Sequence, residues 1–574
     1  MPNKVWRYKN KGCTDSEIAE LSRLSRVPPI IALLLRNRGI TNPQEVHGYI
    51  RKTLGTVHDP SELDDMDKAA SRLVDAIKNH EKITVYGDYD VDGVTSTALA
   101  VRFLRKHGAD VSYYIPSRES EGYGINVMAV NKIARSGTKL MLTVDCGITA
   151  CGEVELAKTM GMEVIITDHH LCKDKLPAAY AVVDPKRPGS KYPFDGLAGV
   201  GVTFKLVLAA AKLLGGKTAD CFFEYANLAA IGTVADIVPL LDENRVIADK
   251  GIKLVQDSKN PGIKALLAVS GADKRPVNAT AVAFMIAPRI NAGGRLGSAD
   301  KAVELLLTDD DAEAAKLAAE LEEDNRERRQ LEQKIFEEAM EMIAADPDFD
   351  KKKVIVLGGS GWHPGVIGIV ASRVTEKFYK PSIMISFDEK GNGKGSARSI
   401  EGFNMFEALT DSAEILTNFG GHAMAAGVGV AKADIDAFSE KINKYAKERL
   451  TPEDMVAKID IDCELPPKLA TAEIAELLEY MEPFGAENPK PIFSMCGVKI
   501  NKISQMGADL THLRMVIEKN GIVLNAVGFR MGGAAEHFSE GEYVNIAFTL
   551  EINNFRGEKN AQLILKDING RGDR

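Results

Sequence analysis

The sequence predicts an α/β protein of several domains, with a doubly wound parallel sheet in its first half and a β-barrel at its end. Between about residues 80 and 240, short apolar runs alternate with helix-like segments, which is typical of βαβ units. After residue 450 the pattern changes to many short β-like runs, compatible with a five-stranded barrel. The length of 574 residues leaves room for about three or four domains of roughly 150 residues each.

Composition narrows the class of protein further. A hydrophobic content of 45% and a charged content of 27% are typical of a soluble globular protein. No apolar run approaches the ~18 residues of a membrane span, and the first residues lack a signal-peptide core, so we expect a cytoplasmic protein without membrane contact. Seven cysteines without a CxxC pair indicate neither a disulfide framework nor a zinc ribbon. The net charge of −9 argues against phosphate binding over the whole surface, but leaves room for a local basic groove.

The first 75 residues are polar and helix-like, and we expect a helical region that either caps the sheet or helps to shape the entrance for a substrate. The strands of the parallel sheet then follow in order, with helix-like segments between them. They are expected at ITVY (83–86), VSYYIP (111–116), KLMLTV (139–144) and MEVIIT (162–167).

Three carboxylates follow the first of these strands in the stretch VYGDYDVDG. Asp88, Asp90 and Asp92 are two residues apart, and such a buried cluster is unfavourable unless a cation neutralises it. A calcium-binding EF-hand loop also begins D-x-D-x-D-G, but its twelfth residue is a glutamate, and here that position is Leu99. A metal site at the end of a strand is therefore the better interpretation.

Polar residues also follow the other strands, and a further carboxylate follows the apolar segment NLAAIGTVA. Because the carboxyl ends of parallel strands meet at one edge of a sheet, we expect these side chains to share one site. A lone aspartate after a strand would more often form a turn or a helix cap. The residues are Asp145, Asp168, His169, His170 and Asp236.

Oxygen ligands with one or two imidazoles suit Mn²⁺ or Mg²⁺. Four or more carboxylates exceed the needs of one ion, and two ions about 3.5–4 Å apart are the usual arrangement for attack of water on phosphorus. The sequence therefore predicts hydrolysis of a phosphoester.

Several motifs carry a resemblance to a known family. GDYDVDG, TVDCGIT, TDHH and GTVADIVPL resemble, in order and spacing, the four motifs of the DHH phosphoesterase superfamily. PRINAGGRLG, GWHPGVIGIVASR, SARSIEGFN and FGGHAMAAGV are similar to its DHH-associated domain, and MEPFGAENPKPIF to the OB-fold domain of its single-strand-specific exonucleases. The resemblance implies an N-terminal region at 1–75, a DHH catalytic domain at 76–300, a connector helix at 301–349, a DHH-associated substrate-binding domain at 350–450 and an OB-fold domain at 451–574.

The resemblance also implies roles for single residues. Asp88 matches a further acidic position, His170 a residue that contacts the scissile phosphate or the leaving oxygen, and Asp168 would orient the two imidazoles. Tyr86 stands where many members have histidine, so either one ion has a poorer ligand set or Asp88 completes it. The implied ligands of two Mn²⁺ or Mg²⁺ ions are Asp90, Asp92, Asp145, His169 and Asp236, with Asp145 bridging.

Arginines and small residues are candidates for binding the substrate. Arg289 and Arg295 surround a glycine pair, a pattern that suits either an anion cradle or a charged turn. The resemblance places this segment and Arg118 near the phosphates of the bound strand, and assigns substrate binding to the small-residue loop of Gly420, Gly421 and His422. Two weaker candidates, equally compatible with surface ion pairs, are Arg373 and Arg398.

The segment 311–345 is rich in helix formers, and we interpret it as a rigid connector of about 50 Å rather than a coiled coil, because its apolar stripe breaks at DNRERRQ. In the barrel, exposed aromatic residues would stack on bases, although each is more often a core residue. These candidates are Phe493, Phe529, Tyr543 and Phe555.

The function implied is a monomeric 5′-to-3′ exonuclease that hydrolyses single-stranded DNA with a free 5′ end to 5′-mononucleotides, in DNA repair and recombination. The strand would thread into a cleft between the DHH and DHH-associated domains. A RecQ-type helicase and a single-strand-binding protein are the partners suggested.

Other members of the superfamily provide the alternatives. Some cleave oligonucleotides, cyclic dinucleotides or pyrophosphate, but these typically lack the OB region. Another is a catalytically weak scaffold at the replication fork that has lost metal ligands. Outside the superfamily, GVGVTF (199–204) is a weak dinucleotide-binding pattern because it lacks the third glycine.

Overall fold

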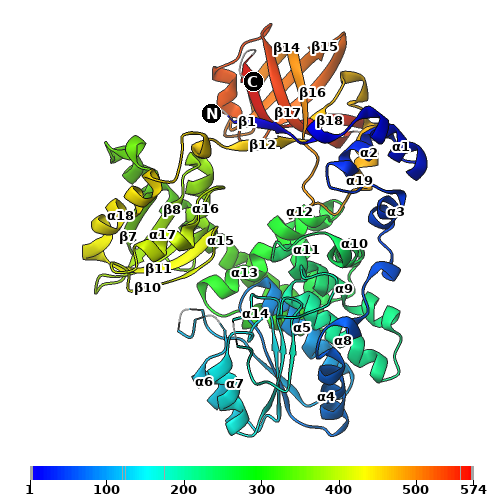
Figure 1. Cartoon of the computed structure of the whole chain (residues 1–574), viewed down its shortest axis with the longest axis vertical. Helices are drawn as coiled ribbons and strands as arrows, with labels where there is room; N and C mark the ends of the chain where they lie inside the picture. Colours follow the sequence, from blue (N-terminus) through cyan, green and yellow to red (C-terminus); the bar gives the residue numbers. More distant parts are fainter. Residues whose placement is uncertain (1–3, 119, 123, 174, 556–557, 571–574) are drawn as a thin grey trace. The chain divides into compact units, whose positions relative to one another are not determined.

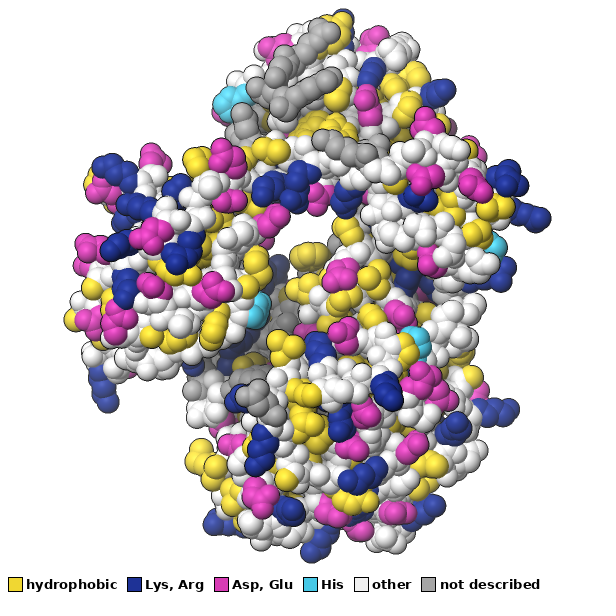
Figure 2. Space-filling model, in the orientation of Figure 1, with side chains coloured by type: hydrophobic (Ala, Val, Ile, Leu, Met, Phe, Trp, Pro, Cys, Tyr) yellow, Lys and Arg dark blue, Asp and Glu magenta, His cyan; other side chains and the backbone are white. Residues whose placement is uncertain are grey.

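The computed structural model describes residues 4–118, 120–122, 124–173, 175–555 and 558–570. The chain forms two compact units. The sheet unit comprises Gly12–Asn325 and Glu473–Pro491, and the barrel unit comprises Met1–Lys11, Arg326–Ala472 and Ile492–Arg574. No helix in the described part of the chain is long and apolar enough to cross a membrane. Acidic and basic side chains are interspersed over the face shown in Figure 2, in keeping with the modest net charge.

The sheet unit is built on five parallel strands in the order β3-β2-β4-β5-β6, so the predicted doubly wound fold is confirmed. The strand order reverses between β2 and β4, and ligands of such sheets bind outside the carboxyl ends at this switch point. The strands are β2 (Ile83–Tyr86), β3 (Val111–Tyr114), β4 (Leu140–Val144), β5 (Glu163–Thr167) and β6 (Ala181–Val183).

Helices cover both faces of this sheet (Figure 1). Alternate residues of β4 enter different cores, with Leu140 and Leu142 on one face and Met141 on the other. Burial on both faces explains why these strands appear in the sequence as continuous apolar runs. The first face is covered by α4 (Met66–Lys78), α5 (Val91–Lys106) and α8 (Gly199–Leu213), and the second by α6 (Val127–Arg135) and α7 (Cys151–Thr159).

Further helices complete the sheet unit. They are α1 (Asp15–Ser25), α2 (Pro29–Arg36), α3 (Pro43–Arg51), α9 (Thr218–Ala235), α10 (Asp242–Gln256), α11 (Pro261–Ser270), α12 (Ala279–Ala281), α13 (Ala287–Leu296) and α14 (Asp300–Leu307).

The N-terminal region is not entirely helical, so this part of the expectation is wrong. Strand β1 (Val5–Tyr8) pairs in parallel with β12 (Lys458–Ile461) of the barrel unit. Trp6 fixes the strand by donating from Nε1 to Asp567 Oδ2 at 2.8 Å. This partner lies 561 residues away in the sequence, so no local pattern could indicate the pairing.

The connector consists of two helices rather than one. Helix α14 ends at Leu307, and α15 (Asp311–Ala345) is a continuous helix of 35 residues. Leu317 and Leu321 join the core of the sheet unit. The boundary between the two units falls within α15.

The barrel unit contains a mixed sheet in the order β10-β11-β9-β8-β7 and a C-terminal barrel. Pairing of β14 with β17 closes a ring of five strands through β15, β16 and β18, which confirms the predicted barrel. The elements are β7 (Ile355–Ser360), α16 (Ile367–Phe378), β8 (Ser382–Phe387), β9 (Asn392–Arg398), α17 (Met405–Asp411), β10 (Asn418–Gly421), β11 (Ala425–Ala431), α18 (Ile435–Lys447), β13 (Cys463–Glu464), β14 (Phe493–Met506), β15 (His512–Lys519), β16 (Ile522–Gly528), β17 (Tyr543–Phe555) and β18 (Glu558–Gly570). Helix α19 (Ala472–Glu479) belongs, except for its first residue, to the sheet unit.

Candidate metal centre

The turn from β2 into α5 brings three aspartates to the switch point of the sheet. Asp88 is buried, and Asp90 is the N-cap of α5, where its Oδ1 accepts from Gly93 N at 3.1 Å. A Cβ on Gly93 would lie 2.4 Å from Asp88 O. Only glycine therefore allows the turn to close this tightly.

Asp92 is held by the start of a second helix, α8. Gly199 N and Val200 N each donate to its carboxylate at 2.7 Å, an arrangement that the positive end of a helix favours. A Cβ on Gly199 would lie 2.4 Å from Asp145 Oδ1. The segment 199–204, weak as a dinucleotide-binding pattern, therefore has another use: its first amides orient one carboxylate while its first glycine leaves room for another.

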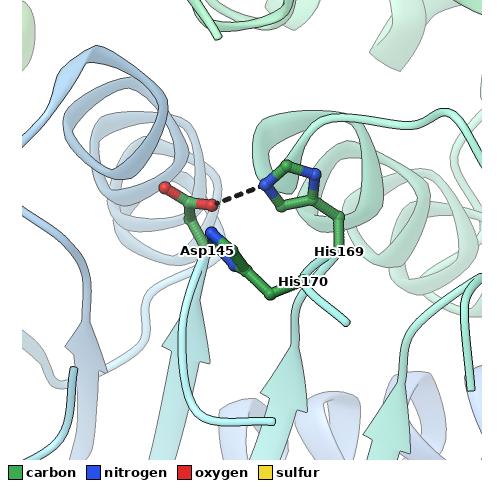
Figure 3. A group of neighbouring side chains, drawn as sticks. All are labelled: Asp145, His169 and His170. Atoms are coloured by element: carbon green, nitrogen blue, oxygen red, sulfur yellow. Dashed lines mark ion pairs between the residues drawn. The ribbon is translucent and has the colours of Figure 1, made fainter. Parts of the chain in front are cut away.

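Asp145 and the two histidines follow the next two strands. Asp145 has a φ of 59°, a left-handed conformation that aspartate tolerates better than most residues. In Figure 3 the ring of His169 faces Asp145, and the distance from Nε2 to Asp145 Oδ1 is 3.3 Å. The same Nε2 lies 3.5 Å from Asp236 Oδ2 and 3.9 Å from Asp92 Oδ2. Residues from four separate segments thus converge on one point.

Asp168 orients only one of the two imidazoles. Its Oδ1 lies 2.7 Å from His170 Nδ1, whereas His169 contacts it through the backbone N–H at 2.8 Å. Its Oδ2 accepts from Ile148 N at 2.9 Å. Burial acts to raise the pKa of Asp168, but these hydrogen bonds and the charge of His170 outweigh burial and lower the pKa.

Three overlapping groups of side chains each place their possible ligand atoms within 4.8 Å of one another. Asp145 and His169 each belong to two of the groups, and of the two only the carboxylate, with its two oxygens, could bridge a pair of ions. The groups are Asp88, Asp90 and Asp145; Asp92, His169 and Asp236; and Asp145, His169 and His170.

The pKa values of the clustered carboxylates are raised, as expected for a buried site whose negative charges lack a cation. Burial, followed by the charges of neighbouring carboxylates, raises the pKa of Asp88 to about 8 and that of Asp236 to about 7. The same causes raise the pKa values of Asp92 and Asp145 well above the ordinary value. Burial, then the charge of His170, lowers the pKa of His169 to about 3, which leaves its imidazole neutral and able to bind a metal.

Buried ligand atoms that make no hydrogen bond indicate that the residues fit a divalent ion. Within the described part of the chain, buried Asp88 Oδ1, Asp145 Oδ1 and His169 Nε2 have no hydrogen-bond partner. A buried polar atom without a partner is rare unless an ion or a water completes it. Carboxylate oxygens with an imidazole suit Mn²⁺ or Mg²⁺.

Tyr86 does not offer a replacement for a histidine ligand. Its ring is buried and stacks on Tyr114 at 5.5 Å, and its hydroxyl donates to Gly124 O at 2.9 Å. Asp88 instead lies in the first group with Asp90 and Asp145. Of the two alternatives for this position, the geometry favours Asp88 completing the ligand set.

Two of the three arginine candidates in the sheet unit lie near the cluster. Arg118 packs over the ring of Tyr89 at 5.3 Å. In the sequence, Tyr89 stands between Asp88 and Asp90. A Cβ on Gly294 would lie 2.3 Å from Tyr89 O, so Gly294, directly before Arg295, packs against the same turn. Arg289 is different, because it is buried, pairs with Glu322 and donates to Met285 O. These contacts are those of the charged-turn alternative, and a role of Arg289 in binding substrate stays a prediction.

The candidates in the barrel unit have mixed surroundings. Arg373 pairs with Glu332 at 2.9 Å and lies 3.9 Å above the ring of Phe336. These contacts are those of a surface ion pair, the alternative to substrate binding. Arg398 donates to Ser396 Oγ and Ala397 O. The small-residue loop at the end of β10 is exposed at each of its three positions, Gly420, Gly421 and His422.

The aromatic candidates of the barrel separate by exposure. Phe493 is a core residue, whereas Phe529 is 59% and Tyr543 is 47% exposed. The side chain of Phe555 lies outside the described part of the structure. Phe529 and Tyr543 therefore remain the candidates for stacking on bases.

The sequence is similar to known proteins along most of its length. Residues 82–233 match the model of the DHH family N-terminal domain, 351–448 the DHHA1 domain and 461–567 the RecJ OB domain. The single-stranded-DNA-specific exonuclease RecJ of Bacillus subtilis is 41% identical over 98% of this chain and 70% of its own length. That of Escherichia coli is 34% identical over 96% of this chain and 98% of its own length.

A solved structure extends the likeness to the fold. RecJ of Thermus thermophilus in complex with Mn²⁺ matches with a TM-score of 0.84 at 33% identity, covering 98% of this chain and 79% of that chain. Its complex with Mg²⁺ matches with a TM-score of 0.77 at 31% identity, covering 98% and 78%. The chain belongs to the RecJ family of single-stranded-DNA-specific exonucleases, within the DHH phosphoesterases.

Proposed function

We propose that this protein is a metal-dependent exonuclease that degrades single-stranded DNA from its 5′ end and releases 5′-mononucleotides. The observation that carries the proposal is the buried cluster of carboxylates and histidine with unpaired ligand atoms. The names of its relatives, single-stranded-DNA-specific exonucleases, supply the substrate class. A role in DNA repair and recombination, alongside a RecQ-type helicase and a single-strand-binding protein, belongs to the same proposal.

The proposed cofactor is a pair of Mn²⁺ or Mg²⁺ ions, the metals with which RecJ of Thermus thermophilus was solved. When bound, such ions activate water and neutralise the negative charge of the reacting phosphate. Asp145, shared by two groups of ligand atoms, would bridge the ions. The residues that would hold them are Asp88, Asp90, Asp92, Asp145, His169 and Asp236.

The remaining residues of the site position the substrate. Asp168 holds Nδ1 of His170 at 2.7 Å, which fixes the ring so that its other nitrogen can donate to a phosphate oxygen. Arg118 and Arg295, beside the turn that carries Asp88 and Asp90, would bind the phosphates that precede or follow the scissile one. Contacts to phosphates carry no base identity, so little sequence preference is expected.

A time course on DNA labelled at either end tests the proposal. A single strand with a 5′ label should release labelled mononucleotide in Mn²⁺ or Mg²⁺ and none in EDTA, while a blunt duplex stays intact. A 3′ label should appear in mononucleotide only late, after the strand has been consumed. Asp145→Asn should abolish release without unfolding the protein. Release of the 3′ label first would refute the polarity, and full activity of Asp145→Asn would refute the site.

A further inference from the structure

A short segment far along the chain packs onto the domain that carries the metal cluster. Residues 481–491, here called the strap, belong to the sheet unit, although the chain on both sides of Glu473–Pro491 belongs to the barrel unit. In Figure 1 this orange segment lies beside the blue N-terminal helices of the sheet unit. The matched OB model begins at residue 461, so sequence comparison alone assigns the strap to a different domain.

One buried asparagine anchors the strap. Asn488 is 0% exposed, and its Nδ2 donates to Met481 O at 3.0 Å and to Pro483 O at 2.7 Å. Its Oδ1 accepts from Tyr49 OH at 2.7 Å and from Arg38 Nε at 3.0 Å. The amide of Asn488 therefore makes hydrogen bonds within the strap and also binds it to the segments that carry Tyr49 and Arg38.

The backbone of the strap is fixed by cations from the same helical segments. Arg38 Nη2 donates to Pro489 O at 2.7 Å, and Lys52 Nζ donates to Glu482 O at 2.8 Å. Hydrogen bonds from charged donors are about twice as strong as neutral ones. The strap is thus held near both of its ends.

The opposite side of the strap contacts the turn that carries Asp236. Leu240 N donates to Ala486 O at 3.0 Å. A Cβ on Gly485 would lie 2.6 Å from Leu240 Cδ1, so the strap approaches this residue as closely as a glycine permits. Leu240 is four residues after Asp236, in the connection between α9 and α10.

That turn has a conformation that needs support. Ile237, directly after Asp236, has a φ of 61° and is 75% exposed. A β-branched residue is rarely found in this region, and such a conformation persists only when its surroundings fix it. Two contacts do so: Asn244 Nδ2 donates to Pro239 O at 3.0 Å, and Leu240 N donates to the strap.

We propose that the strap is a positioning element of the metal centre, and that Asn488 is a positioning residue acting through Leu240 on Asp236. The inference rests on the proposed function, because it requires Asp236 to be a metal ligand. It makes a segment within the matched OB region a support of the metal centre. Loosening the strap should weaken metal binding while leaving the remaining ligands in place.

The test is Asn488→Ala, with Asn488→Asp as a milder variant that keeps an acceptor for Tyr49 and Arg38. A matched control exists in the barrel unit. Asn443 is 6% exposed and also makes four hydrogen bonds, accepting from Lys353 N and Val354 N and donating to Val354 O and Ser439 O. Asn443→Ala should therefore remove a similar number of buried hydrogen bonds without touching the turn of Asp236.

Manganese affinity is measured on the full-length proteins by the electron paramagnetic resonance signal of free Mn²⁺, with thermal unfolding followed in parallel. Asn488→Ala should raise the dissociation constant about tenfold, as loss of an outer support typically does, with a smaller rise for Asn488→Asp. Asn443→Ala should lower the unfolding temperature with unchanged affinity. Unchanged affinity in both folded Asn488 variants would overturn the strap proposal. Failure of the unaltered protein to bind Mn²⁺ would instead overturn the proposed function.

Discussion

Replacement of Gly199 by alanine is the substitution for which the structure gives the most definite expectation. The added Cβ would lie 2.4 Å from Asp145 Oδ1, 2.5 Å from its Cβ and 2.7 Å from its Cγ. Non-bonded carbon atoms meet at about 3.5 Å, so the Asp145 side chain or the start of α8 must move by about 1 Å. Either movement disturbs Asp145, which belongs to two of the ligand groups.

The expected cost is larger for activity than for stability. A displacement of about 1 Å in a catalytic constellation costs about 100-fold in rate, whereas one added methyl group in a packed site costs about 1–3 kcal/mol of unfolding free energy. The assay is release of mononucleotide from end-labelled single-stranded DNA at saturating Mn²⁺, with urea unfolding in parallel. Gly201→Ala is the control in the same helix, because the three atoms nearest to its Cβ all belong to the Leu197 side chain, the closest at 3.1 Å. Activity of Gly199→Ala equal to that of Gly201→Ala would mean that the start of α8 does not constrain Asp145.

Three further predictions concern other residues. Tyr86→Phe should lower the unfolding free energy by about 0.5–1.5 kcal/mol, because the hydrogen bond to Gly124 O is lost. The Mn²⁺ affinity should stay unchanged, and weaker Mn²⁺ binding would mean that Tyr86 supports the metal. Arg118→Ala should raise KM for single-stranded DNA with little effect on stability. Arg289→Ala, which breaks an ion pair, should instead lower the urea midpoint of unfolding. A raised KM for Arg289→Ala with an unchanged urea midpoint would make Arg289 a substrate-binding residue. Burial would raise the pKa of Asp249, but nearby lysines outweigh it and lower the pKa below 3.8, so its stabilising effect is present above pH 3.8 and lost as the pH falls through the folded-state pKa. Asp249→Asn should accordingly lower the unfolding free energy by about 1–3 kcal/mol at pH 7, with the difference vanishing in strong acid; a difference independent of pH would contradict this assignment.

Much of the site could be predicted because one rule connects distant residues. In a parallel sheet the carboxyl ends of all strands lie at one edge, so Asp88, Asp145 and His169 could be brought together from sequence alone. The distances of 3.3 Å and 3.5 Å from His169 Nε2 to Asp145 and Asp236 agree with that expectation. The motif order then led to the family to which the chain belongs.

The residues that were missed act through the backbone or through long-range packing. Gly199 and Val200 hold Asp92 by their amides, and an amide has no signature in the sequence beyond the glycine that exposes it. Arg289 has the residue type of a phosphate ligand, but its partner Glu322 lies on another helix. Pairing of β1 with β12 and contact of the strap with Leu240 likewise depend on tertiary structure.

The most direct test of the central claim is anomalous diffraction at the manganese absorption edge from crystals grown with Mn²⁺. Anomalous peaks are expected at the carboxylates of Asp145 and its neighbours Asp92 and Asp236, and Asp145→Asn should lose these peaks together with nuclease activity. An active protein whose crystals show no manganese at this cluster, or manganese bound only elsewhere, would exclude the cluster as the metal centre.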